Sequence, residues 1–297
     1  MKYKGELALL TAAALYGFFG VFSRVISFNI PLFFQAWTRN VLATLIIFVL
    51  VKFFGRWEKI KPSDIKWFIL RSLGGFISFI SLYIGFIYLD FATNYFISYS
   101  TATIAGYFFG YLFFKEKLTR VNLVALFLSM IGLFLIFRIS LHADKLIYLL
   151  ISTIGGITTS VWMVFSKKIS GTYSNLQMNM VDSVLALALP FILSVIFKEQ
   201  WTLPALNWLW GANLLFAALF MTTSFLIVYG FKYVEAQKGS LILLFDILVG
   251  VLLGYILFHE TISLQALAGG LFILAAMILP NLKLKSTTPR QSRRDMS

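Results

Sequence analysis

The segment VFSRVIS at residues 21–27 returns as VFSKKIS at residues 164–170, and the two differ at only two positions. One of these differences is the conservative exchange of Arg24 for Lys167. The copies lie 143 residues apart, close to half of the 297-residue chain, and each ends an apolar stretch. Internal similarity at this spacing predicts two half-chains of one architecture, with a site where the halves meet.

Composition places the chain in a membrane. Hydrophobic residues make up 60% of it and charged residues only 12%, about half the charged share of a soluble domain. Apolar runs of about 20 residues recur, and each can cross a bilayer as a helix. The predicted fold class is an all-α membrane protein of ten transmembrane helices, arranged as two inverted five-helix repeats. The predicted spans are 5–27, 32–53, 66–88, 91–113, 119–138, 145–166, 175–197, 206–230, 236–258 and 263–282. Pro190 is the one proline inside a span, where it predicts a kink.

The net charge of +13 reflects topology rather than nucleic-acid binding. Most of the 25 Lys and Arg residues fall in alternate connections, which places both chain ends in the cytoplasm by the positive-inside rule. The chain contains no cysteine, so a disulfide framework or thiolate metal site is excluded. We expect no cofactor, no metal and no nucleic-acid partner. We expect a small-molecule substrate, membrane lipid around a monomer, and location in the inner (cytoplasmic) membrane.

An odd number of spans per half inverts the second copy relative to the first. The predicted domains are a first repeat at 1–140, a second, inverted repeat at 141–282, and a basic cytoplasmic tail at 283–297 without apolar periodicity, predicted to be disordered. Inverted repeats related by an axis in the membrane plane are characteristic of secondary transporters.

The fourth and ninth predicted spans repeat a glycine pattern. Gly106 and Gly110 align with Gly250 and Gly254. Glycines four residues apart in an apolar helix let another backbone approach closely. The shared spacing predicts that these two helices cross near the pseudo-two-fold axis, although glycine is also common by chance in membrane helices.

Short motifs in both halves resemble the drug/metabolite transporter superfamily of the EamA type. They are Ala14-Leu15-Tyr16-Gly17, the pair Pro31 and Arg39, the helix ends Glu116-Lys117-Leu118-Thr119 and Glu260-Thr261-Ile262-Ser263, and Asp246. The chain departs from the pattern at Ile247, where the family typically has proline, and near Ile104. The resemblance implies a ten-helix monomer with a central cavity that moves small metabolites. It also implies that the fifth and tenth spans pack peripherally.

Asp246 is the sharpest candidate for a functional residue. It lies about ten residues into its span, roughly 15 Å deep, and shares a helical face with Gly250 and Gly254. A charge near the bilayer midplane is costly and is therefore a candidate for function. Asp246 could contact a substrate cation or couple transport to protons. A structural hydrogen bond to a neighbouring helix is the alternative.

Arg39 and Asp182 occupy equivalent positions of the two repeats. Because the copies are inverted, the two residues approach the midplane from opposite sides. They could pair with each other or line the cavity, and either could instead be structural. Arg39 and Asp182 are therefore predicted, with Asp246, to serve in ion coupling or as structural charges.

Polar and aromatic residues near mid-span predict a cavity lining suited to amphipathic solutes such as aromatic amino acids or drug-like cations. These predicted substrate-binding residues are Tyr16, Gln35, Tyr83, Asn94, Tyr99, Trp162 and Asn213 together with Asp246, and Asn179 belongs to the same group. Tyr and Trp are also frequent at membrane interfaces, which leaves a second interpretation for each.

The charged turns around Glu116 and Glu260 are expected to be helix-end chemistry at the surface. The two histidines, His142 and His259, do not favour a shared metal site. No metalloprotease or serine-hydrolase motif is present, which argues against an enzyme. The predicted function is secondary active transport of an amino acid or related amphipathic solute by alternating access, as an exporter or exchanger. The alternatives are a flippase for a lipid or lipid-linked carrier on the same fold, and a channel or structural role.

Overall fold

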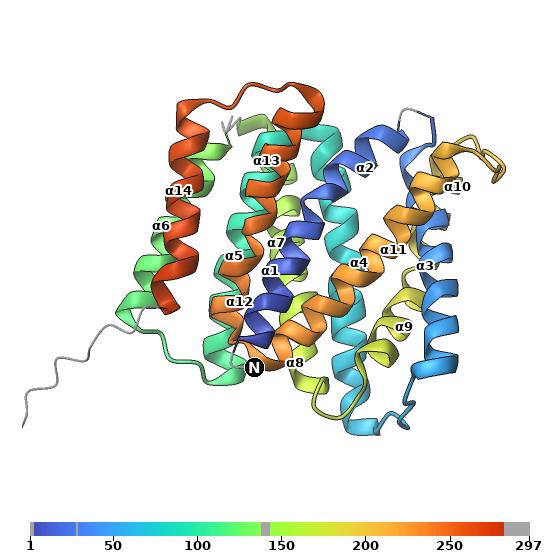
Figure 1. Cartoon of the computed structure of the whole chain (residues 1–297), viewed down its shortest axis with the longest axis horizontal. Helices are drawn as coiled ribbons and strands as arrows, with labels where there is room; N and C mark the ends of the chain where they lie inside the picture. Colours follow the sequence, from blue (N-terminus) through green and yellow to red (C-terminus); the bar gives the residue numbers. More distant parts are fainter. Residues whose placement is uncertain (1–2, 28, 138–142, 282–297) are drawn as a thin grey trace, which may run out of the picture.

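The computed structural model describes residues 3–27, 29–137 and 143–281 (Figure 1). This part of the chain is helical and contains no strand, which confirms the all-α fold class. The predicted tail at 283–297 and His142 lie outside the described residues. The helices of the first half are α1 (Lys4–Tyr16), α2 (Phe18–Ser27), α3 (Leu32–Phe54), α4 (Pro62–Tyr88), α5 (Phe91–Phe114) and α6 (Arg120–Ile136). Those of the second half are η1 (Ala143–Lys145), α7 (Leu146–Val164), α8 (Ser166–Ile169), α9 (Asn175–Leu185), α10 (Ala188–Ile196), α11 (Trp208–Tyr233), α12 (Ala236–Leu243), α13 (Phe245–Phe258), α14 (Leu264–Ile278) and η2 (Leu279–Asn281).

Within the described ranges, 8 helical stretches are long and apolar enough to cross a membrane. Several of them join two consecutive helices, such as α1 with α2 and α12 with α13. The helix α6 is apolar but shorter, with 17 residues. The 24-residue α5 is long enough but rich in Ser, Thr and Tyr, and it is not among the eight. The helices follow the predicted spans, while the count of ten is not exact by this criterion.

Three of these stretches are interrupted near their middle. The interruptions lie at Gly17 between α1 and α2, at Ala186 and Leu187 between α9 and α10, and at Leu244 between α12 and α13. Around Leu244 the backbone hydrogen bonds shorten from four residues to three, because Leu244 N bonds to Leu241 O at 3.1 Å. The regular helix is therefore interrupted inside the bundle at three separate places.

The predicted kink at Pro190 appears as the break between α9 and α10. Pro190 has no N–H to donate to the carbonyl of Ala186, four residues earlier. The side-chain amide of Asn40 on α3 donates to this carbonyl instead, at 3.2 Å. A side chain of one repeat thus satisfies the backbone that the other repeat leaves open.

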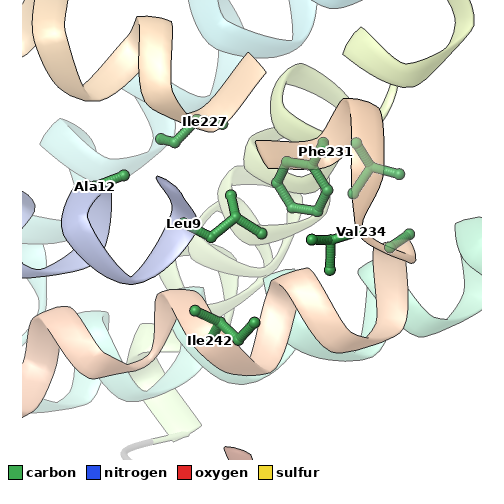
Figure 2. Packing of buried hydrophobic residues seen from close by; sticks show 8 residues of the cluster. Leu9, Ala12, Ile227, Phe231, Val234 and Ile242 are labelled. Carbon is green, nitrogen blue, oxygen red and sulfur yellow. The ribbon is translucent and has the colours of Figure 1, made fainter. Parts of the chain in front are cut away.

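The helices of the two halves interleave. Figure 2 shows Leu9 and Ala12 of α1, Ile227 of α11 and Ile242 of α12 in one buried cluster. A Cβ atom at Gly230 would lie only 2.4 Å from Leu9 Cγ, so the close packing of α11 against α1 requires glycine there. The first and second halves are therefore one packed body rather than two separate bundles.

The helices α6 and α14 pack together at the edge of the bundle (Figure 1). Gly132 of α6 and Gly269 of α14 face each other, and a Cβ atom at either would lie within 2.7 Å of the other's carbonyl oxygen. Seam residues around them, Ala125, Ile273 and Ala276, are fully buried. This is the peripheral packing of the fifth and tenth spans that the family resemblance implies.

Candidate functional site

A cavity of about 550 Å³ lies inside the bundle, bordered by helices of both repeats. All three helix interruptions contribute to its wall, through Tyr16, Ala186 and Leu244. The candidate residues that line it are Tyr16, Arg39, Tyr99, Trp162, Asn179, Asp182 and Asp246. Much of the remaining wall is apolar, which is typical of sites for small organic solutes. The cavity lies where residues of the two halves meet.

Asp246 is the second residue of α13, two positions after the break at Leu244. Its carboxylate accepts a hydrogen bond of 2.5 Å from the Tyr99 hydroxyl through Oδ2. The other oxygen, Oδ1, is buried and has no hydrogen-bond partner. Gly17 lets the α1–α2 break approach, because a Cβ there would lie 3.0 Å from the Asp246 carbonyl oxygen. The site thus contains a carboxylate with one oxygen held by protein and one free to accept a donor.

Arg39 lines the same cavity from α3. Its guanidinium carbon lies 4.4 Å from the centre of the Phe216 ring and 5.6 Å from that of Phe220. Its Nε is buried without a hydrogen-bond partner, and among the described residues no carboxylate lies within ion-pair distance of it. Aromatic faces stabilise this cation only in part, since a guanidinium has five donors to satisfy. Arg39 is a cation that can bind an anionic group.

Asp182 pairs with Arg71 of α4 rather than with Arg39. Arg71 Nη2 lies 2.9 Å from Asp182 Oδ2, and the Arg71 side chain is only 1% exposed. Ser72 Oγ donates to Asp182 Oδ1 at 2.8 Å, and Trp162 Nε1 donates to Oδ2 at 3.2 Å. Arg71 Nε also donates to the Trp162 carbonyl at 3.1 Å. This network ties α4, α7 and α9 together on one wall of the cavity.

The other polar candidates lie in helix interfaces outside the cavity lining. Asn94 makes two bonds between helices, since its amide donates to Leu82 O at 2.9 Å and accepts from Ser152 Oγ at 2.7 Å. Asn213 donates to Thr38 Oγ1 at 2.9 Å. Their roles here are helix-to-helix bonds, so substrate contact by them stays a prediction.

Gln35 and Tyr83 complete the set of predicted residues. Gln35 is fully buried, and neither polar atom of its side-chain amide has a partner. The centre of the Tyr83 ring lies 4.0 Å from the centre of the Phe33 ring on α3. Both residues lie outside the cavity lining.

The glycine pattern serves different purposes in the two repeats. Gly106 faces α12, where a Cβ would lie 2.0 Å from Ser240 Oγ, and Gly110 faces Gln237. A Cβ at Gly250 would meet only Gly17 O, at 3.9 Å, and one at Gly254 would meet Glu260. The close approach of the fourth and ninth spans is therefore made by the first repeat's glycines alone.

Two charged residues were given no functional role by the sequence. Arg71 lies within the predicted span 66–88, and an arginine there requires a counter-charge, which is the signal that could have indicated Asp182. Glu116 was expected at the surface, yet its side chain is only 6% exposed. Its counterpart Glu260 is exposed as expected. Within the described ranges, no cluster of His, Asp and Glu could hold a metal ion.

Comparison with known proteins agrees with this architecture. The model of the EamA-like transporter family matches residues 3–138 and 146–282, so the chain belongs to that family, in accord with the drug/metabolite transporter superfamily. A crystal structure of another protein superposes with a TM-score of 0.82 at 13% identity, covering 95% of this chain and 99% of that one. This likeness concerns the fold alone.

A curated relative, an uncharacterized transporter from Archaeoglobus fulgidus, is 28% identical over 167 residues, or 55% of this chain. The chain spans 58% of the length of that relative. Its family and its long apolar helices make the chain a multi-pass membrane protein of the EamA-like transporter family.

Proposed function

We propose that this protein is a secondary transporter for a small zwitterionic metabolite, an amino acid or a related amphipathic solute. The observation that carries the proposal is the presence in one cavity of an unpaired guanidinium and a half-satisfied carboxylate. A solute with a carboxylate and an ammonium group would satisfy both, the carboxylate at Arg39 and the ammonium at Asp246 Oδ1. Tyr16, Tyr99 and Trp162 provide aromatic surface for its side chain.

The transport cycle follows from the repeat. Two inverted half-chains can expose a site between them to one side of the membrane and then to the other. The excess of Lys and Arg in alternate connections supports an orientation with both chain ends in the cytoplasm. Because the sequence contains no nucleotide-binding motif, an ion or solute gradient drives the movement, with export or exchange as the direction.

Binding to the purified protein tests the two contacts separately. An aromatic amino acid has both charges, its methyl ester lacks the carboxylate, and its N-acetyl derivative lacks the ammonium group. The substitution Arg39→Gln should weaken binding of the amino acid by about 10- to 100-fold, which corresponds to a hydrogen bond between charged groups, and should leave binding of the ester unchanged. The substitution Asp246→Asn should weaken binding of the amino acid and leave binding of the N-acetyl derivative unchanged.

Matched controls and transport complete the experiment. Arg120→Gln and Asp144→Asn remove the same charges at exposed positions outside the cavity and should leave affinity within twofold. Counterflow in proteoliposomes should saturate, whereas a channel would conduct without saturation. Equal weakening of all three solutes by both substitutions would contradict the charge assignment. Lack of any saturable counterflow would contradict the transport function itself.

One observation favours the flippase alternative. Four residues of the cavity wall are exposed apolar side chains, and they come from α4 and α9: Ile69, Leu73, Phe76 and Leu185. An opening between these helices within the bilayer would admit a lipid chain. Dithionite quenching of fluorescent phospholipid in proteoliposomes measures this activity, and a faster rate with the protein than without it would support the alternative.

A further inference from the structure

The two repeats build the same elbow at opposite faces of the bundle. After α5, Lys115 adopts a left-handed φ of 55°, and the N–H of Glu116 returns to the end of that helix at 3.0 Å. After α13, His259 adopts a φ of 54°, and the N–H of Glu260 returns in the same way at 3.2 Å. Such a left-handed residue is a common way to end a helix. Both elbows therefore present a glutamate in the same manner.

A glycine in each repeat makes room for the glutamate. A Cβ atom at Gly110 would lie 2.5 Å from Glu116 Oε2, and one at Gly254 would lie 2.6 Å from Glu260 Oε2. The repeated glycine is thus explained by the carboxylate beside it. The local geometry of the two elbows is matched in backbone, glycine and side chain.

The partners of the two glutamates differ. Glu116 accepts from the N–H groups of Ala236 and Gln237, at 2.7 and 3.1 Å, at the start of α12, and from Lys167 Nζ at 2.7 Å. Its side chain is 6% exposed and that of Lys167 is 17% exposed. A carboxylate at a helix N-terminus receives both hydrogen bonds and the favourable helix dipole. We call these four residues the amino-terminal latch, because Figure 1 shows the starts of α1 and α12 at this end.

Glu260 has a looser arrangement at the other end of the bundle. It pairs with Arg24, the counterpart of Lys167, at 2.7 Å, and the two side chains are 57% and 50% exposed. We call this pair the opposite latch. An exposed ion pair contributes little to stability, whereas a buried and fully bonded carboxylate is firmly held. The Glu116 carboxylate is thus inserted at a helix N-terminus, whereas the Glu260 carboxylate is not.

Each latch joins one repeat to the other. Because the elbows match, the difference between the latches reflects the interface between the repeats at each face. We propose that Glu116 and Glu260 are the gating residues of the transporter, and that the two latches exchange states during the cycle. In the opposite state Glu116 leaves α12, and Glu260 inserts at the start of α5, where Ala92 and Thr93 are the counterparts of Ala236 and Gln237. This inference rests on transport by alternating access.

The helix α12 connects the amino-terminal latch to the cavity. It begins at the residues that Glu116 binds, and its later residues Ser240 and Leu243 line the cavity. The break at Leu244 follows, and Asp246 comes two residues later. Release of the start of α12 would therefore move the segment that carries the candidate substrate carboxylate.

Accessibility of a cavity cysteine tests the gating role. The natural chain has no cysteine, so Ser183→Cys places a single thiol in the cavity wall. A membrane-impermeant maleimide is applied to either side of oriented proteoliposomes. The parent should react at least 10-fold faster from the opposite face than from the amino-terminal face. Adding Glu116→Gln should raise the rate from the amino-terminal face at least 5-fold, and adding Glu260→Gln should not.

A second variant covers the case in which Glu116→Gln does not fold. Lys167→Gln leaves the Glu116 carboxylate bonded to the start of α12 and removes only the ammonium group. It should shift the ratio of labelling rates from the two faces in the same direction by at least 2-fold. Unchanged ratios in every folded latch variant would overturn the gating role of Glu116.

Disulfide trapping tests the exchanged state. Cysteines at Glu260→Cys and Ala92→Cys should form a bond under mild oxidation, because a disulfide needs Cα atoms within about 7 Å. The bond should suppress labelling of the cavity cysteine from the opposite face, and the single Glu260→Cys variant controls for intermolecular bonds. Absence of the disulfide in a protein that catalyses counterflow would overturn the exchange alone. A disulfide that forms in a variant showing no counterflow even after reduction of the bond, with no counterflow in the parent, would instead refute the proposed function.

Discussion

The helices α3 and α5 of the first repeat run unbroken past the cavity, whereas their counterparts in the second repeat are interrupted there. The α9–α10 stretch breaks after Leu185, and the α12–α13 stretch breaks at Leu244. Each break adjoins a carboxylate of the cavity wall, Asp182 one turn before the first and Asp246 just after the second. The two duplicated segments thus provide a continuous wall in the first copy and an acidic, interrupted wall in the second.

The residues at matching positions sharpen this contrast. Arg39 on α3 is the counterpart of Asp182, and Ala102 on α5 is the counterpart of Asp246. Tyr99, which holds Asp246, has Leu243 as its own counterpart. The backbone plan is repeated, while the charged chemistry of the site differs between the repeats. Substitutions at matching positions should therefore have unequal effects.

The largest expected effect is the loss of the Asp182 carboxylate. Asp182→Ala leaves the Arg71 guanidinium buried without its ion-pair partner, which should lower the free energy of unfolding by about 3–5 kcal/mol. Arg39→Leu at the matching position of α3 should lower the free energy of unfolding by less, because no carboxylate is left buried without its partner when Arg39 is removed. Chemical denaturation in detergent micelles measures both. An equal cost at the two positions would contradict the unequal roles of the repeats.

The double replacement Arg71→Leu with Asp182→Leu is the control for this prediction. It removes both charges together and should recover most of the lost stability, since apolar replacements of a buried pair are often neutral. A double variant as unstable as Asp182→Ala would show that shape rather than charge is responsible.

A smaller effect is expected at the contact between α5 and the α13 start. Tyr99→Phe removes the hydroxyl that donates to Asp246, a bond to a charged group worth about 1.5–3 kcal/mol. Tyr111→Phe on the same helix is the matched control, because the Tyr111 side chain is exposed, and it should have no measurable effect. Thermal unfolding of the two variants compares them directly. A Tyr99→Phe protein as stable as the control would argue against a charged Asp246.

The smallest effect concerns the hydrogen bond from Asn40 to the Ala186 carbonyl, which replaces the backbone bond that Pro190 cannot donate. Asn40→Leu leaves the Ala186 carbonyl without its side-chain partner and should cost about 1 kcal/mol. In a Pro190→Ala background residue 190 regains an N–H, so the same replacement should cost less. A double-mutant cycle measures this coupling. Equal costs in both backgrounds would show that Asn40 does not compensate for Pro190.

Much of the fold was readable from the sequence. Hydropathy placed the helices, Pro190 indicated the α9–α10 break, and the repeated motifs indicated the family. The break at Leu244 carries no proline or glycine, so local sequence could not reveal it. The burial of Glu116 depends on the start of α12, more than a hundred residues away, and its exposed counterpart has the same local pattern. A local sequence pattern predicts a helix or a turn, whereas contacts across the repeat interface depend on residues far apart in the chain.

For the site, depth in the membrane drew attention to Asp246, Arg39 and Asp182, and all three line the cavity. The pairing of Asp182 was not predictable, because Arg39 and Arg71 are both arginines within spans. Asn94 and Asn213 were also selected by their position at mid-span, but their side chains bond to neighbouring helices instead of lining the cavity. A polar residue at mid-span can have either role, and its position alone does not distinguish them.

The paired glycines of α6 and α14 have a practical consequence. With a backbone carbonyl filling the space of each absent Cβ, neither helix can slide or tilt against the other without collision. The two helices should travel as one rigid body through every stage of the cycle. Spin labels placed on them would report a constant separation, an internal ruler against which the displacement of every other helix can be measured.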